Sequence, residues 1–199
     1  MKVNYRVLIS LSYVNVRLVT CFFWSILLIA QLKCPNIIDL EASGFGVDSY
    51  PIEVGFVLSD GTRYCSLIRP KDDWLHWSEE AEEHHKIPRT DLIQSGASVE
   101  QVASELNHKL YNQTVYSDGW VVDQTWLIKL FYRAGMPMQF RVSALDMILS
   151  EPQMDIWHQV KQEVETELNI VRHRASNDAL IIQQTFVRTR EISQALQHT

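Results

Sequence analysis

Cysteine and positive charge are both scarce in this 199-residue chain. The cysteines are Cys21, Cys34 and Cys65, and they form no CxxC pair and no metal-binding spacing. Because the cysteines are few and their number is odd, the sequence argues against stabilising disulfide bonds and favours a reducing compartment. There are 18 basic against 24 acidic residues, and the net charge of −6 argues against a protein that coats DNA. This charge remains compatible with an enzyme that meets nucleic acid through metal ions.

What the chain does contain is typical of a globular protein. Apolar residues make up 46% of it and charged residues 21%, which excludes disorder, collagen and coiled coil. We find no internal repeat, linker or low-complexity segment. A single domain has roughly 150 residues, so we expect one domain with a short extension.

The extension is predicted at the N-terminus, where an apolar run extends from Leu18 to Leu32. A membrane-spanning helix needs about 20 apolar residues, so this run is short, and its signal-peptide cleavage pattern is poor. A membrane anchor, a cleaved signal and a non-native extension stay open, and we favour the last. We therefore expect an extension over 1–33, a domain over 34–192 and a tail over 193–199. The expected location is cytoplasmic, with membrane attachment as the minor alternative.

Hydrophobic patterning after Pro35 predicts strands first and helices later. Strands are expected over 36–41, 50–58, 62–68 and 113–117, with an Asp-Gly turn at 60–61. Helices are expected over 78–85, 90–94, 98–110, 123–134, 143–149, 154–170 and 176–190. This order predicts a layered α+β or α/β architecture, of which we expect α/β.

Two acids, Asp39 and Glu41, stand near the end of the first predicted strand. Because they are two residues apart, both side chains point to the same face. A loop of small residues follows them directly. Such a pair forms a hard oxygen site suited to Mg²⁺ or Mn²⁺, although strand-end acids also occur without function.

Further candidates stand where two later helices begin. Asp123 opens the predicted helix 123–134, where its alternative role is an N-cap. Asp118 follows a strand, but its Asp-Gly pair is typical of a turn. His173 and Asp178 form an HxxxxD spacing across the start of the last helix. Each residue alone has an ordinary structural explanation, and only the combination indicates a function.

This ordered set resembles the DEDDh family of 3′→5′ exonucleases, which includes the proofreading subunit of bacterial DNA polymerase III, ribonuclease T and oligoribonuclease. The matching segments are Asp39-Leu-Glu41-Ala-Ser-Gly44, Asp123 with Trp126-Leu127, and His173-Arg-Ala-Ser-Asn-Asp178-Ala179. Glu83-His84-His85-Lys86-Ile87 resembles the His-Gly-Ile loop of the family, with Lys86 in place of the usual glycine. The apolar-His-Asn run that usually precedes the second motif is missing, so Asp118 stays an alternative to Asp123.

The resemblance implies a ribonuclease H-like fold, in which a central mixed sheet (an antiparallel meander followed by parallel strands) is flanked by helices. It also implies two Mg²⁺ or Mn²⁺ ions per active site, with His173 as the general base on the attacking water. The metal ligands that it implies are Asp39, Glu41, Asp123 and Asp178. The substrate-binding residues that it implies are Phe45, Ser43, Gly44, His85 and Arg174.

The predicted function is therefore a metal-dependent 3′→5′ exonuclease that acts on single-stranded RNA or DNA ends, with RNA slightly preferred. Its relatives are often dimers, so a homodimer stays open, whereas a membrane partner is not expected. The alternative is a non-catalytic ribonuclease H-like module that binds nucleic acid or a polymerase partner. The complete set of carboxylates together with His173 favours the enzyme.

Overall fold

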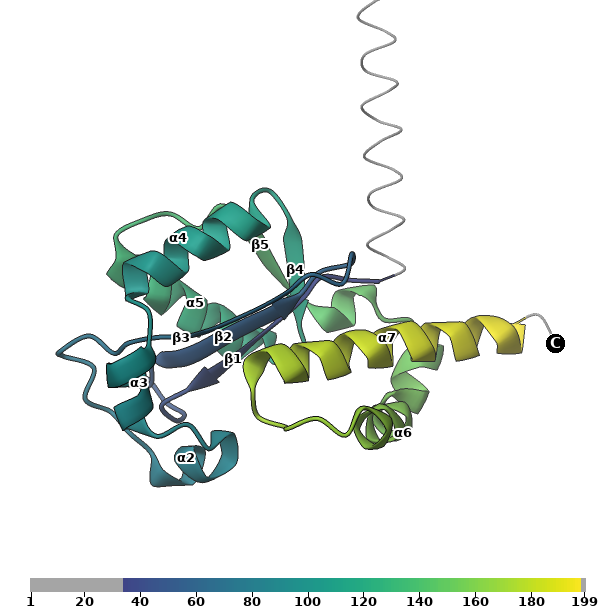
Figure 1. Ribbon diagram of the computed structural model, residues 1–199. Helices are drawn as coiled ribbons and strands as arrows, with labels where there is room; N and C mark the ends of the chain where they lie inside the picture. The colour runs from purple at the N-terminus through teal and green to yellow at the C-terminus, as the bar shows by residue number, and fades with distance from the viewer. Residues whose placement is uncertain (1–33, 198–199) are drawn as a thin grey trace, which may run out of the picture. The chain divides into compact units, whose positions relative to one another are not determined.

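The computed structural model describes residues 34–197 (Figure 1). The extension predicted over 1–33, with its three interpretations, lies outside the described residues. Within the described range, none of the helices has the length and apolar character needed to cross a membrane.

A five-stranded mixed sheet lies at the centre of the fold (Figure 1). Its strands are β1 (Ile37–Ala42), β2 (Pro51–Val57), β3 (Arg63–Leu67), β4 (Thr114–Ser117) and β5 (Arg141–Ala144). The order is β3-β2-β1-β4-β5, antiparallel from β3 to β1 and parallel from β1 to β5. The predicted mixed sheet, a meander followed by parallel strands, is confirmed.

Helices cover both faces of this sheet (Figure 1). One face carries α4 (Val99–Leu110) and α5 (Trp120–Ala134), and the other carries α7 (Ala175–Gln197), against whose outer side α6 (Glu151–Leu168) packs. The short helices α2 (Glu79–His85) and α3 (Arg89–Ser95) lie near the end of the sheet where β1 ends. The 3-10 helix η1 (Leu145–Ile148) follows β5 directly.

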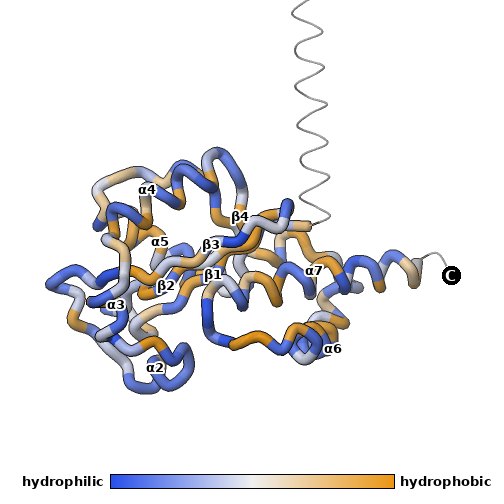
Figure 2. The backbone as a smooth tube through the Cα atoms, in the orientation of Figure 1, coloured by the Kyte–Doolittle hydropathy of each residue, from blue (hydrophilic) through white to orange (hydrophobic). Residues whose placement is uncertain are grey.

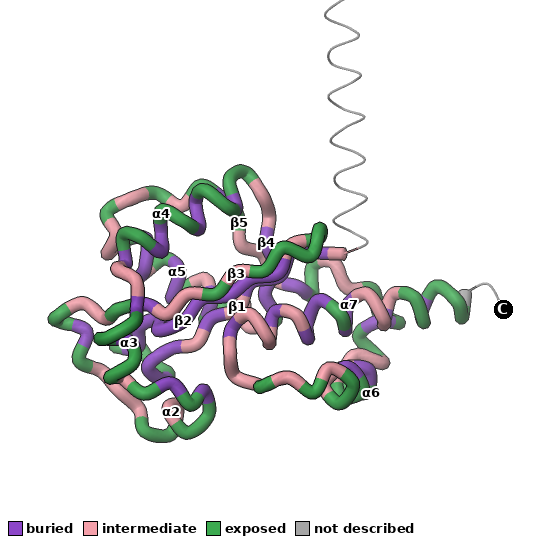
Figure 3. The backbone as a smooth tube through the Cα atoms, viewed as in Figure 1, coloured by how far each residue is buried: buried purple, intermediate pink, exposed green. Residues whose placement is uncertain are grey.

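The side chains of β1 alternate between two apolar clusters. Ile38, Leu40 and Ala42 belong to the larger core, which α4 and α5 cover. Ile37 belongs to the smaller cluster, which includes Phe186 of α7. Figures 2 and 3 show that β1 and β2 are largely apolar and buried between these layers. Alternation therefore places the acids of β1 on the face that α7 covers.

Neighbouring strands diverge where the site is built. β4 pairs with β1 only at Ile37, opposite Tyr116, although β1 continues to Ala42. Within residues 34–197, the edge of β1 beyond Ile37 thus has no strand partner on the β4 side. In parallel sheets such a divergence at the carboxyl ends of strands leaves room for a functional site.

Four predicted elements differ from the structure, and the first of them, the helix predicted over 154–170, spans Glu151–Leu168. The helix predicted over 123–134 begins earlier, at Trp120, because Gly119 is its N-cap. The helix predicted over 143–149 is wrong over its first two residues, since Ser143 and Ala144 pair with β4 as the end of β5. The last helix continues past residue 190 to Gln197, so residues 193–197 of the predicted tail are helical.

Candidate active site

Asp39 and Glu41 lie side by side on β1, both partly exposed on the α7 face. Their antiparallel partners on β2 are Gly55 and Glu53, respectively. The first partner has no side chain and the second is a buried carboxylate with 0% exposure. On the β2 side, Asp39 therefore borders a position without a side chain, and Glu41 borders a buried carboxylate.

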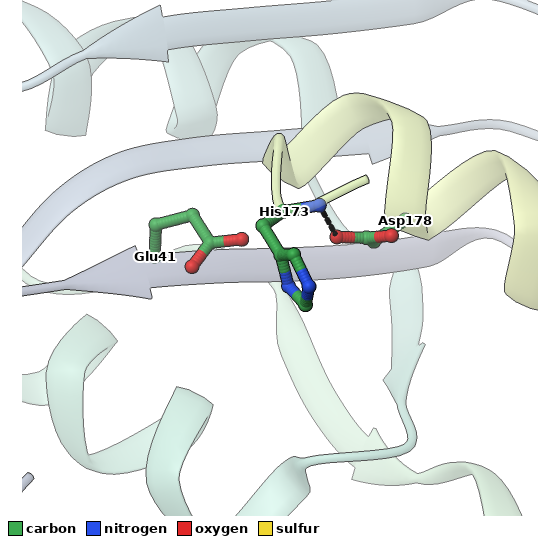
Figure 4. A group of neighbouring side chains, drawn as sticks. All are labelled: Glu41, His173 and Asp178. Atoms are coloured by element: carbon green, nitrogen blue, oxygen red, sulfur yellow. Dashed lines mark hydrogen bonds between the residues drawn. The ribbon is translucent and has the colours of Figure 1, made fainter. Parts of the chain in front are cut away.

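The start of α7 brings the third motif to this pair. Ligand atoms of Glu41, His173 and Asp178 all lie within 4.8 Å of one another, an arrangement that could hold a metal ion (Figure 4). The backbone N–H of His173 donates to Asp178 Oδ2 at 2.7 Å. His173 has a φ of +59°, in the left-handed region that is uncommon for residues other than glycine. The chain thus turns sharply where it presents the imidazole.

Gly55 allows α7 to approach the sheet so closely. A Cβ atom at this position would lie 2.2 Å from the backbone nitrogen of Ser176 and 2.5 Å from the carbonyl carbon of Ala175. No side chain larger than hydrogen fits in this space, so glycine is required for the contact. The close approach places the first turn of α7, with Asp178, beside Asp39 and Glu41.

Glu53 anchors the same turn. Its carboxylate accepts hydrogen bonds from Arg174 Nε at 3.0 Å and Arg174 Nη2 at 2.6 Å, and from the Ala175 N–H at 2.8 Å. A buried carboxylate with three such donors is well satisfied. Arg174, which the resemblance implied for substrate binding, is engaged in this ion pair. Its side chain remains 43% exposed.

A second arginine orients Asp178. Arg172 Nε donates to Asp178 Oδ1 at 2.7 Å, and its guanidinium also pairs with Glu165 of α6. Both oxygens of Asp178 therefore accept one hydrogen bond each, one from Arg172 and one from the His173 backbone. Each carboxylate oxygen keeps a free lone pair for a further ligand.

Asp123 reaches β1 from the opposite face. It lies in the first turn of α5 and is 2% exposed. The Ser117 hydroxyl donates to it, and so does the backbone N–H of Leu40 on the free edge of β1. Asp118, by contrast, is exposed and pairs with Lys161 at 3.0 Å. The geometry therefore favours Asp123 over Asp118 as the carboxylate of the second motif.

The gathered acids raise one another's pKa. Burial, followed by the charges of Asp123 and Glu41, raises the pKa of Asp39 well above its usual range. Burial, followed by the charges of Asp178 and Glu53, raises the pKa of Glu41 to about 8. Burial raises the pKa of Asp123 to about 7, although its hydrogen bond from Ser117 opposes this. Such a cluster of hard oxygen atoms is electrostatically favourable for a divalent cation.

Three of the predicted substrate-binding residues lie in the loop after β1, and they differ in how far they are exposed. Ser43 is fully buried, and its hydroxyl accepts from the Tyr50 N–H at 3.1 Å. Gly44 has a φ of +140°, and a Cβ there would lie 2.7 Å from His76 Cε1. Phe45 is 79% exposed, with its ring centre 6.3 Å from that of Trp126. Ser43 and Gly44 thus shape the loop, and Phe45 presents its ring at the surface.

The His-Gly-Ile-like loop contributes a residue that the sequence did not single out. His85, predicted to bind substrate, is 3% exposed, and its Nδ1 accepts from the Ile87 N–H at 3.0 Å. Its neighbour His84 is exposed, and its ring centre lies 5.7 Å from that of His173. Lys86 has a φ of +55°, which explains why glycine suits this position.

Sequence reasoning thus missed Glu53, Gly55 and His84. The first two lie in the strand sequence PIEVGFV, where an acid and a glycine interrupt an otherwise apolar run. A glycine inside a strand often marks a close backbone approach, and a buried acid needs a partner. These two signals could have been noticed. The position of His84 beside His173 left no signal in the sequence.

Comparisons with family models and with curated proteins give no match. Among solved structures, E. coli Exonuclease I in complex with a 5cy-dT13 oligonucleotide is similar with a TM-score of 0.58 and 15% identity. The match covers 79% of this chain and 41% of that one. The same enzyme in complex with a dA16 oligonucleotide has a TM-score of 0.58 and 12% identity, and the match covers 77% of this chain and 40% of that one. A full-length 3′-exonuclease has a TM-score of 0.53 and 14% identity, and the match covers 79% of this chain and 60% of that one.

These matches show that the chain has the ribonuclease H-like fold of known 3′-exonucleases, as predicted. The matched region is about two fifths of the length of the Exonuclease I chains. The resemblance to 3′→5′ exonucleases is confirmed at the level of the fold.

Proposed function

We propose that this chain is a metal-dependent 3′→5′ exonuclease that removes nucleotides from the end of single-stranded nucleic acid. The observation that carries the proposal is the convergence of Glu41, His173 and Asp178, whose ligand atoms lie within 4.8 Å of one another. Asp39 stands beside Glu41 on the same strand, and Asp123 approaches from the other face. The solved Exonuclease I complexes, which share the fold, contain single-stranded DNA oligonucleotides. They support single-stranded DNA as a substrate, and the preference for RNA stays a prediction.

The donor set fits divalent cations. The residues are carboxylates held close together, and burial with mutual repulsion raises the pKa of Asp39 and Glu41. We assign Asp39, Glu41 and Asp178 as the ligands of Mg²⁺ or Mn²⁺, with Asp123 in support, and two ions as the resemblance implies. Bound ions would lower the pKa of the attacking water and neutralise charge on the phosphate.

His173 is proposed as the general base. Imidazole exchanges protons near neutral pH, which suits the removal of a proton from water. The Asp178 carboxylate holds the backbone of His173 in its left-handed conformation, and the His84 ring stands at its side. The imidazole is therefore presented next to Glu41 in a defined position (Figure 4).

His85 is proposed to contact the substrate through its second ring nitrogen. Because Nδ1 accepts from the Ile87 N–H, the ring proton of neutral His85 is on Nε2. This Nε2 is buried and has no hydrogen-bond partner among the described residues. A buried donor without a partner is unfavourable, and a substrate oxygen would satisfy it.

The test is degradation of labelled single-stranded DNA and RNA, with a free or a blocked 3′ end, in Mg²⁺, Mn²⁺ or EDTA. We expect mononucleotide release only with a free 3′ end and a divalent cation. Asp39→Asn and Asp178→Asn should each abolish it, because a neutral amide replaces a charged ligand. Asp118→Asn tests the other candidate for the second motif and should retain activity, since Asp118 is exposed and pairs with Lys161.

Two results would contradict the proposal. Full activity in both Asp39→Asn and Asp178→Asn would exclude the carboxylate cluster as the site. Tight binding of the 3′ end without turnover in either cation would instead support the non-catalytic module.

A further inference from the structure

A cleft of about 670 Å³ lies beside the loop that follows β1 and shares no lining residue with the carboxylate cluster. It is formed by that loop, by residues 73–76 before α2 and by the C-terminal half of α5. Three of its exposed lining residues are apolar or aromatic, since Tyr132 is 82% exposed, Leu75 72% and Val47 91%, and the carboxylates Asp48 and Asp73 are exposed as well. Apolar side chains gathered at one exposed place often mark a binding surface.

The charges of this cleft do not favour a phosphate group. Arg133 donates two hydrogen bonds to Asp73, at 2.6 and 2.7 Å. Lys129 donates to backbone oxygens of the loop after β1. These two cations are matched by two carboxylates, since Asp48 also lines the cleft. A nucleobase suits this lining better, because it offers a flat face to an aromatic ring and polar edges to carboxylates.

The loop after β1 connects this cleft to the proposed active site. Ser43, two residues after Glu41, has its hydroxyl 3.0 Å from Nδ1 of His76, which lines the cleft. Trp126 of α5 donates from Nε1 to the Ser49 hydroxyl at 2.9 Å. Exposed Phe45 lies on the same loop. The loop is therefore held by contacts with a residue of the cleft lining and with α5, and it begins two residues after Glu41.

We infer that this cleft binds an unpaired base of the substrate strand, upstream of the nucleotide that is removed. The inference rests on the proposed function and adds a second contact for a single-stranded substrate. Base-on-aromatic stacking tolerates any sequence, because every base has a π-face. The stacking partner is Tyr132. Its contribution should not depend on salt, unlike contacts to phosphate.

The test compares a long substrate with one that cannot reach the cleft. The long substrate is a 5′-labelled dodecamer of thymidine, and the short one is the p-nitrophenyl ester of thymidine 5′-monophosphate. For Tyr132→Ala, the ratio of kcat/KM for the dodecamer to that for the ester should fall roughly 5- to 150-fold. Tyr132→Phe should keep the wild-type ratio, because the ring remains. Tyr111→Ala is the matched control, since Tyr111 is 59% exposed at the end of α4 and lies outside the cleft.

An unchanged ratio in Tyr132→Ala, or an equal fall in Tyr111→Ala, would overturn the inference. Failure of the proposed function has a different signature, because the wild-type chain would then hydrolyse neither substrate. In that case, fluorescence anisotropy of the labelled dodecamer in Ca²⁺ gives the decision. Weaker binding by Tyr132→Ala would support the cleft as a base site, and unchanged binding would overturn it.

Discussion

Two helices bring carboxylates to β1 from opposite faces of the sheet, and they hold them by different means. On α5, Asp123 is buried and accepts hydrogen bonds from Ser117 and the Leu40 backbone, both neutral groups. On α7, Asp178 is partly exposed and accepts from Arg172, within a set of ion pairs. The hydrogen bonds that hold Asp123 are buried and come from neutral groups, whereas those that hold Asp178 include an ion pair and are partly exposed to solvent.

This difference indicates which of the two carboxylates, Asp123 or Asp178, is more easily moved away from β1. The apolar contacts of α7 with the sheet include Ala179, Ile182 and Phe186, all after Asp178 in the chain. The turn before them depends on the space at Gly55 and on the buried charge of Glu53. We therefore expect changes on the α7 side to cost more activity than comparable changes on the α5 side.

Among changes of residues that position the proposed ligands, the largest effect is expected for Gly55→Ala. The added methyl group would lie 2.2 Å from the Ser176 nitrogen, so α7 must move away from β2. A displacement of about 1 Å can lower activity about 100-fold, and overpacking costs about 1–3 kcal/mol of stability. Exonuclease assays and denaturant unfolding would measure both quantities.

Gly135→Ala is the control for lost stability alone. Gly135 ends α5 with a φ of +66°, and a Cβ there would meet no atom within 4 Å. This variant should lose stability through backbone strain but keep its activity. Equal activity in Gly55→Ala and the wild-type chain would show that the close approach is dispensable.

A smaller effect is expected for Glu53→Gln. The amide keeps the shape of the side chain but loses the charge that holds Arg174 and the Ala175 N–H. Changes of residues that orient metal ligands cost about 10- to 100-fold, so we expect a loss of activity in this range. Activity titrated against Mn²⁺ concentration would show whether the loss is in metal affinity.

Two companion variants would sharpen that result. Arg174→Gln should lower the free energy of unfolding more than Glu53→Gln does, because it leaves a buried charge without its partner. Ser117→Ala, the counterpart on the α5 side, should cost less activity than Glu53→Gln. The opposite ranking would contradict the comparison of the two helices.

The last effect concerns stability and not activity, and it is expected from changes of pH and of cation. The pKa of Glu41 is raised from 4.5 to about 8 and that of Asp123 from 3.8 to about 7, so without metal the folded state retains protons that the unfolded state has lost. This stabilisation is complete below about pH 4 and is lost as pH rises to about 8. In EDTA, the melting temperature of the wild-type chain should therefore fall between pH 5 and pH 8. This fall should be larger than the fall measured for a Glu41→Gln variant over the same range. Mg²⁺ should reduce the fall, and an identical profile in Mg²⁺ and EDTA would contradict this prediction.

Much of the fold could be predicted from the sequence because its signals are local. Alternating polarity marked β1, and the acids at its end were placed on one face correctly. The turn at 60–61 and the strands on either side of it followed from short patterns. The strand over 141–144 was missed, because its sequence RVSA has only one large apolar side chain and leads directly into the 3-10 helix η1, so the pattern does not distinguish strand from helix.

The candidate site divides in the same way. The sequence by itself determined which residues are chemically able to act, since Asp39, Glu41, Asp123, His173 and Asp178 are visible as residue types in order. Only the tertiary structure decided which neighbours these residues contact: Ser117 and the Leu40 backbone lie against Asp123, Glu53 binds Arg174, and His84 lies beside His173. The physical reason is that these contacts join segments far apart in the chain. Such contacts depend on where β4 diverges from β1 and on how closely Gly55 lets α7 approach β2. A local sequence pattern predicts neither of these features.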